Sequence, residues 1–186
     1  PAPTRKGHDA LSTTPIALML DARLTPLERN GWQILRMLRA AEGISPLANL
    51  GQLRRYLTST PLGVRAGYDT ARRVLMVLRL TGWISLVGQH RDPLTGHVLS
   101  ELYQVHESAL DFRQACVLDA RLHELLQACI GHENNLVYRV AIHIRDTLAQ
   151  APGAVPAAHQ EQHHDDDAPP SPPPSKASDY RVTLLE

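Results

Sequence analysis

Five arginines in one part of the chain are the residues whose chemistry is easiest to assign. Arg54 and Arg55 are adjacent, Arg72 and Arg73 are adjacent, and Arg65 lies between the two pairs. A guanidinium group is a planar fork of hydrogen-bond donors that matches phosphate oxygens and the major-groove edge of guanine. The same side chains also serve as ordinary solvated surface residues. The elements that carry them therefore decide between the two interpretations.

The charge of the chain is unevenly distributed. The 19 Lys+Arg balance the 19 Asp+Glu, and a net charge of zero by itself disfavours a nucleic-acid partner. Residues 23–97, however, hold 11 arginines and four acidic residues, a formal charge of +7. Residues 98–150 carry −3 and residues 151–186 carry −4. The net charge of zero thus averages a basic segment with acidic ones. We expect the partner of the basic segment to be double-stranded DNA.

Two helix starts precede the second arginine pair. Thr25 is a suitable N-cap with Glu28 three residues later, and the helix would end near residues 42–43. Asn49 caps a second, short helix. The short apolar run over residues 16–20 follows a proline and is expected to form a strand.

A third helix and a hairpin follow. Apolar spacing over residues 68–80 predicts a helix with one buried side, with Arg73 opposite it and Gly82 just after its end. Residues 83–90 and 97–105 are strand-like and flank a turn rich in Pro and Gly, which predicts a β-hairpin.

A strand, three helices and a hairpin, in that order, are the layout of a winged helix-turn-helix. We predict a mainly α fold with a small β-hairpin, in which residues 15–107 form a winged helix-turn-helix DNA-binding domain. Residues 108–150 would be a C-terminal helical extension. Residues 1–14 would be a flexible N-terminal segment and the Pro-rich residues 151–186 a disordered tail.

The third helix of such a domain enters the major groove, and the hairpin is the wing. The predicted DNA contacts of this recognition helix and its approach loop are Arg65, Tyr68, Thr70, Arg72, Arg73 and Met76. The predicted DNA-backbone contacts are Arg54 and Arg55, and the predicted wing contacts are His90, Arg91, Thr95 and His97. Met76 has a second interpretation, packing against the wing, and the wing residues have one as an ordinary polar hairpin tip.

The sequence lacks the common motifs of catalytic, metal and cofactor sites, so it does not predict an enzyme. The sequence has neither GxGxxG nor GxxxxGK[ST], and it has no CxxC pair. His123-Glu124 and His132-Glu133 both lack the second histidine of HExxH. The His-Asp run at residues 163–167 is interpreted as solvated and not as a metal site. We therefore predict no catalytic residue, no metal and no cofactor.

Composition also bears on location and on the core. The longest apolar run, residues 16–20, is far shorter than the roughly 20 residues of a membrane span, so no membrane partner is expected. Two cysteines, Cys116 and Cys129, make no disulfide framework and favour a reducing bacterial cytoplasm. Both are expected to be buried, and Trp32 and Trp83 are expected to anchor the core and not to stack on bases.

Three stretches carry a family resemblance. LTPLERNGWQILRML covers residues 24–38, TARRVLMVLRLTGWISLV covers residues 70–87, and RDPLTGHVLSELYQVHE covers residues 91–107. Together they resemble the pathogenicity-island replication proteins of integrative and conjugative elements in Gram-negative bacteria, over roughly residues 15–150. The resemblance implies DNA binding in the replication or maintenance of such an element, and it implies no catalytic residues.

Two function classes remain open on the sequence. The first is a sequence-specific double-stranded DNA-binding protein, acting in replication or maintenance of the element or as a transcriptional regulator. The second is a winged-helix adaptor that binds protein and not DNA. In either class, residues 108–150 offer apolar stripes for a homodimer or another protein partner.

Overall fold

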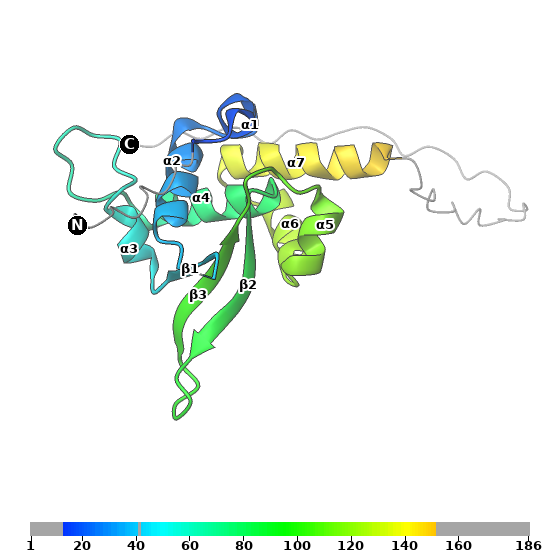
Figure 1. Ribbon diagram of the computed structural model, residues 1–186. Helices are drawn as coiled ribbons and strands as arrows, with labels where there is room; N and C mark the ends of the chain where they lie inside the picture. Colours follow the sequence, from blue (N-terminus) through cyan, green and yellow to red (C-terminus); the bar gives the residue numbers. More distant parts are fainter. Residues whose placement is uncertain (1–12, 41, 152–186) are drawn as a thin grey trace, which may run out of the picture. The chain divides into compact units, whose positions relative to one another are not determined.

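The computed structural model describes residues 13–40 and 42–151, and these form a mixed α/β structure (Figure 1). About half of the described residues are helical, and a small antiparallel sheet completes the fold. The helices are α1 (Ile16–Leu20), α2 (Pro26–Met37), α3 (Leu50–Arg54), α4 (Tyr68–Leu80), α5 (Phe112–Leu118), α6 (Leu122–Ile130) and α7 (Asn135–Gln150). The strands are β1 (Ile44–Leu47), β2 (Ile84–Arg91) and β3 (Val98–Val105). The predicted flexible segment 1–14 and the predicted tail 151–186 lie almost entirely outside the described residues.

The predicted strand over residues 16–20 is wrong, because these residues form helix α1. A short apolar run does not distinguish a strand from a helical turn. Alanine, leucine and methionine favour the helix, and the backbone N–H of Leu18 donates to the carbonyl of Pro15 at 3.1 Å. Leu18 alone of the helix is buried in the core.

The first strand is instead β1, so the sheet has one strand more than the predicted hairpin. The strand order is β1-β3-β2, with both pairs antiparallel. Pro46 lies inside β1 and pairs in register with Leu102. Proline is tolerated there because β1 is an edge strand, which leaves one side of its backbone without a partner strand. The hairpin of β2 and β3 is confirmed, and it extends well away from the helices (Figure 1).

Helix α2 begins as predicted and ends earlier than predicted. Glu28 accepts a hydrogen bond from the backbone N–H of Thr25 at 2.8 Å, which completes the capping box. The helix ends at Met37, and Gly43, with φ of +82°, then makes the turn into β1. The chain needs these residues to reach the sheet, so the helix cannot continue to 42–43.

The two tryptophans anchor the core, as predicted. Trp32 and Trp83 are 0% and 1% exposed, and their rings meet edge to face with centroids 6.3 Å apart. The indole N–H of Trp32 donates to the carbonyl of His106 at 3.0 Å, and that of Trp83 donates to Asp21 Oδ2 at 2.8 Å. Each buried indole thus has the polar partner that burial requires.

Helix α4 is the central element of the described chain. It packs against α2 and α3, against α6 and α7, and against β2. One hydrophobic cluster takes in residues from α1 through α7, including the buried Cys129; Cys116 is only partly buried. The C-terminal helices therefore share their core with the three helices and the sheet that precede them.

Candidate nucleic-acid interface

The turn between α3 and α4 is fixed to α3 at one point. The backbone N–H of Ala66 donates to the carbonyl of Arg54 at 3.0 Å, and Arg54 Nε donates back to the carbonyl of Ala66 at 2.5 Å. Asn49 caps α3 as predicted, accepting from the backbone N–H of Gln52 at 3.2 Å. The connection from α3 to α4 is long, but its last residues are held in place before α4 begins.

Arg54 therefore has a supporting role in addition to its predicted contact with the DNA backbone. Its guanidinium carbon lies 3.8 Å from the centroid of the Tyr68 ring, over the ring face. This is a cation–π contact, and it positions the first residue of α4. The side chain of Arg54 is shared between the Ala66 carbonyl and the Tyr68 ring, which limits its freedom to reach outward.

Arg55 and Arg65 are exposed and line one hollow. The hollow has a volume of about 610 Å³ and lies between α3, the loop and the start of α4. Its lining residues are Ala48, Asn49, Gly51, Gln52, Arg55, Tyr56, Arg65 and Tyr68. In the described part of the chain, no carboxylate pairs with either arginine. Both guanidinium groups are thus available to an anion.

Arg72 lines a second groove beside the first. This groove, of about 370 Å³, runs between the start of α3, helix α4 and strand β3, and it shares Ala48 and Asn49 with the first hollow. The side chain of Arg72 is 57% exposed, and its partner Asp69, 3.0 Å away, is 98% exposed. Such an exposed pair is weak and exchanges easily for a phosphate contact. Met76 lines the same groove, half-buried against the core, so both of its predicted roles are compatible with its place.

Arg73 does not lie on the free side of α4, and that prediction is wrong. Its side chain is 14% exposed, and Nε lies 3.2 Å from Oε1 of Glu28, which is buried. The reason is that α2 packs on α4, so the capping glutamate of α2 needs a counter-charge from α4. Val77 is likewise buried, at 2% exposure. Because α4 is covered on several sides, its buried residues do not fall on one face, and helical periodicity alone does not identify them.

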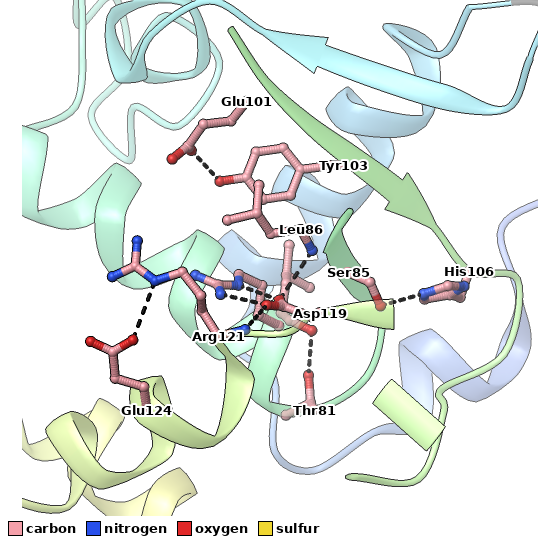
Figure 2. Close-up of polar contacts among 11 residues, drawn as sticks. Thr81, Ser85, Leu86, Glu101, Tyr103, His106, Asp119, Arg121 and Glu124 are labelled. Atoms are coloured by element: carbon pink, nitrogen blue, oxygen red, sulfur yellow. Dashed lines mark hydrogen bonds and ion pairs between the residues drawn. The ribbon is translucent and has the colours of Figure 1, made fainter. Parts of the chain in front are cut away.

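Arg79, at the other end of α4, is also paired internally. Its Nε and Nη2 donate to Asp119 at 2.7 and 2.9 Å. Asp119 further accepts from the backbone N–H of Leu86 (Figure 2). The neighbouring polar contacts in the same view, Ser85 with His106 and Tyr103 with Glu101, are likewise internal. This end of α4 supports the fold.

The tip of the hairpin presents the predicted wing residues to solvent. His90, Arg91, Thr95 and His97 are all exposed. Arg91 donates to the carbonyl of Gly96 at 2.9 Å and to Gln89 at 2.5 Å, within the hairpin. The backbone N–H groups of Leu94 and Thr95 donate to the carboxylate of Asp92 and lower its pKa. The tip is therefore an ordered turn that carries the cationic side chain of Arg91.

The internal pairs reduce the charge that the basic segment offers to a partner. Apart from the exposed pair of Arg72 with Asp69, the paired arginines of this segment are Arg23 with Asp21, Arg36 and Arg39 with Glu107, Arg73 with Glu28, and Arg79 with Asp119. The exposed arginines on α3, the loop, the first turns of α4 and the hairpin are Arg55, Arg65, Arg72 and Arg91. Thr70, the remaining predicted contact, is partly buried in the first turn of α4.

Sequence reasoning missed three residues of the first hollow. Asn49 was assigned to capping alone, and Gln52 was noted only as lying three residues after that cap. Tyr56 was assigned no role, although it is 49% exposed and lines the hollow. The available signal for Tyr56 was its place directly after Arg55, just beyond the end of a short helix.

The described residues contain no group of three or more His, Cys, Asp or Glu side chains that would hold a metal ion. None of the described helices combines the length and the apolar character needed to cross a membrane. Comparison with models of protein families, with curated proteins and with solved structures gives no match.

Proposed function

We propose that this chain is a double-stranded DNA-binding protein built as a winged helix-turn-helix. The proposal is supported by the order of elements, in which α2, β1, α3, α4, β2 and β3 follow one another and the sheet order is β1-β3-β2. In that arrangement α4 is the recognition helix and the β2–β3 hairpin is the wing.

The observation that carries the proposal is the grouping of exposed arginines around the start of α4. Arg55 and Arg65 line one hollow, Arg72 lines the adjoining groove, and the two share lining residues. Arg91 adds a cation on the hairpin that follows α4. Neutralising phosphates with arginine releases counterions and supplies most of the sequence-independent affinity for DNA.

The four arginines divide by position. Arg55 and Arg65 are best placed as phosphate contacts, which set register and orientation but read no sequence. Arg72 projects from α4 itself and is the candidate for a forked contact to a guanine edge. Arg73 has no DNA contact in this proposal, because it neutralises the buried carboxylate of Glu28.

The test is a titration of a fluorescent duplex at several salt concentrations, read by anisotropy. The parent protein is expected to bind with a salt-dependent affinity. Arg55→Ala and Arg65→Ala should each reduce the slope of log K against log salt by about 0.9. The matched control is Arg121→Ala, which removes another exposed arginine at the start of α6 and should leave the slope unchanged. No salt-dependent binding by the parent, or equal slopes in all variants, would overturn the proposal.

Reversing the charges of Arg72 and Arg73 together would not measure the loss of DNA contacts alone. Arg73→Glu would place a second carboxylate beside buried Glu28 and destabilise the fold directly. Arg72→Glu alone changes an exposed side chain, and it is expected to abolish specific binding while the melting temperature stays the same.

We further propose that the DNA belongs to an integrative and conjugative element, and that the protein acts in the bacterial cytoplasm at its origin or at a promoter. The support is the resemblance of residues 24–38, 70–87 and 91–107. Genome-wide mapping of bound DNA in the host tests this. Peaks at the origin indicate replication or maintenance, peaks at promoters indicate transcriptional regulation, and an absence of peaks on the element contradicts both.

A protein-binding adaptor is the second candidate function, and helix α1 favours it. Ile16 and Leu20 are both 76% exposed, and Met19 is 48% exposed, so most of this helix is apolar surface open to solvent. Contiguous apolar surface marks sites of protein contact. If the protein is an adaptor without DNA binding, it should not bind duplex DNA near physiological salt. Its mass in light scattering should rise from that of a monomer to that of a complex, and Leu20→Glu should abolish this rise.

A further inference from the structure

The hollow between α3 and α4 contains more than a phosphate site requires. Tyr56 and Tyr68 are 49% and 56% exposed, and both line it beside Arg55 and Arg65. Phosphate contacts need cations, whereas aromatic rings beside cations are the usual composition of surfaces on which unpaired bases stack. Tyr68 is one of the predicted contacts of the recognition helix, but the phosphate contacts proposed above use the arginines and need neither ring.

The Tyr68 ring is held as a fixed platform. Arg54 covers one face at 3.8 Å from the ring centroid, and the same guanidinium is hydrogen-bonded to the Ala66 carbonyl. Tyr68 nevertheless keeps more than half of its surface exposed, so the ring is supported on one side and open elsewhere. A ring held in this way loses little further freedom when a base stacks on it, which favours binding.

Two side-chain amides add hydrogen-bond donors to the hollow. The oxygen of Asn49 accepts from the backbone of Gln52, and the oxygen of Gln52 accepts from the backbone of Ala48. Each amide therefore directs its NH₂ group elsewhere. In the described residues neither NH₂ group donates to another residue, so both are available to the carbonyl oxygen of a base.

We propose that this hollow holds one unpaired nucleotide of a single DNA strand. The base stacks on Tyr68 and receives hydrogen bonds from Asn49 or Gln52, and the flanking phosphates contact Arg55 and Arg65. The volume of about 610 Å³ is within the range of sites that bind small organic ligands, which a nucleotide matches in size. The inference rests on the proposed function, because it uses the same two arginines, and it adds single-stranded DNA as a substrate class.

The experiment measures binding of two probes to the full chain: a short single strand of thymidine with one 2-aminopurine, and a duplex of random sequence. Stacking on a tyrosine quenches 2-aminopurine fluorescence, so the parent is expected to quench the single-strand probe. Tyr68→Leu should weaken single-strand binding about tenfold and abolish quenching, since each stacked base contributes on this scale. Tyr68→Phe should retain both, because stacking needs the ring and not the hydroxyl.

The controls separate this inference from the function on which it rests. Tyr138→Leu changes a tyrosine of similar exposure on α7 and should alter neither probe. Melting temperatures of all variants are compared, and Tyr56→Leu provides a second test of the hollow if Tyr68→Leu is less stable. Duplex binding that persists while the parent shows no quenching, or equal single-strand affinity for the Leu and Phe variants, overturns the single-strand site alone. If the parent protein does not bind the duplex probe at all, the proposed function is overturned.

Discussion

Both Nε and Nη2 of Arg79 donate to the carboxylate of Asp119, at 2.7 and 2.9 Å, and Asp119 is 1% exposed. The same carboxylate accepts the backbone N–H groups of Leu86 and Arg121, at 3.1 and 3.3 Å. One residue at the junction of α5 and α6 thus ties the end of α4 to β2. Helix α5 ends here because the backbone of Asp119, with φ of −110° and ψ of 91°, is not helical.

Asp119→Ala is expected to destabilise the protein by about 3 kcal/mol, because it leaves the largely buried guanidinium of Arg79 without its counter-charge. Urea unfolding followed by circular dichroism measures the change. The matched control is Glu124→Ala, whose partner Arg121 is 68% exposed and whose loss should cost no more than about 1 kcal/mol. Equal effects of the two substitutions would show that Asp119 contributes no more than a surface ion pair.

Gly82→Ala tests a close approach between two backbone segments. Gly82 has φ of +78°, and a Cβ there would lie 2.1 Å from the carbonyl oxygen of Leu110. Gly96 also has a positive φ, of +71°, but a Cβ there meets nothing within 4 Å. Gly96→Ala should therefore cost only the backbone strain, about 1–2 kcal/mol, and Gly82→Ala should cost clearly more. Unfolding free energies that agree between the two variants would contradict the close approach.

Asp21 gives a stability dependence at acid pH. Burial by itself would raise the pKa of Asp21, but hydrogen bonds from Arg23 and Trp83 outweigh burial and lower it from 3.8 to about 2. A folded-state pKa below the unfolded value stabilises the fold above pH 3.8, and this stabilisation is lost as the pH falls toward 2. Asp21→Asn should be less stable by about 1 kcal/mol at neutral pH, because solvent screens the interactions of this partly buried carboxylate, and the difference should shrink in that acid range.

Thermal unfolding of the Asp21→Asn variant and the parent, at a series of pH values from neutral to acid, measures this difference. Asp146→Asn is the control, because Asp146 is 50% exposed and pairs with Arg145 at the surface. If the stabilities of the parent and the Asp21→Asn variant change with pH in parallel, Asp21 is not the source of the acid sensitivity.

Arg91→Ala tests the hairpin as a wing. Arg91 is exposed at the end of β2, where a phosphate contact would contribute to the salt dependence of duplex binding. Its loss should lower the salt slope by about 0.9 without a change in melting temperature. Arg145→Ala on α7, where the side chain is 52% exposed, provides the comparison. A slope that stays at the parent value would exclude Arg91 from the interface.

Strong local signals predicted much of the fold. Helix α4 was found because its apolar spacing persists for 13 residues, and Gly82 ends it with the expected positive φ. The hairpin was found because two apolar runs flank a Pro/Gly turn. Strand β1 was missed, since four residues with a central proline carry little strand signal, and only pairing with β3 reveals it.

The part of the site that sequence missed depends on contacts between distant residues. Arg73 meets Glu28 from 45 positions away, and no local pattern shows that this arginine is neutralised. Arg54 and Tyr68 likewise meet only because the loop turns back at Ala66. Charge counts along the sequence therefore overstated how many arginines of the basic segment face outward.

The central position of α4 has a consequence for how a DNA sequence would be recognised. A helix packed against five other elements cannot rotate or slide to fit different base pairs without disturbing the core. Its exposed part is short, and Arg72 is the arginine that it presents. Direct reading of bases would thus be limited to few positions. Preference among sites would come largely from how readily the duplex bends and narrows to meet a rigid protein surface.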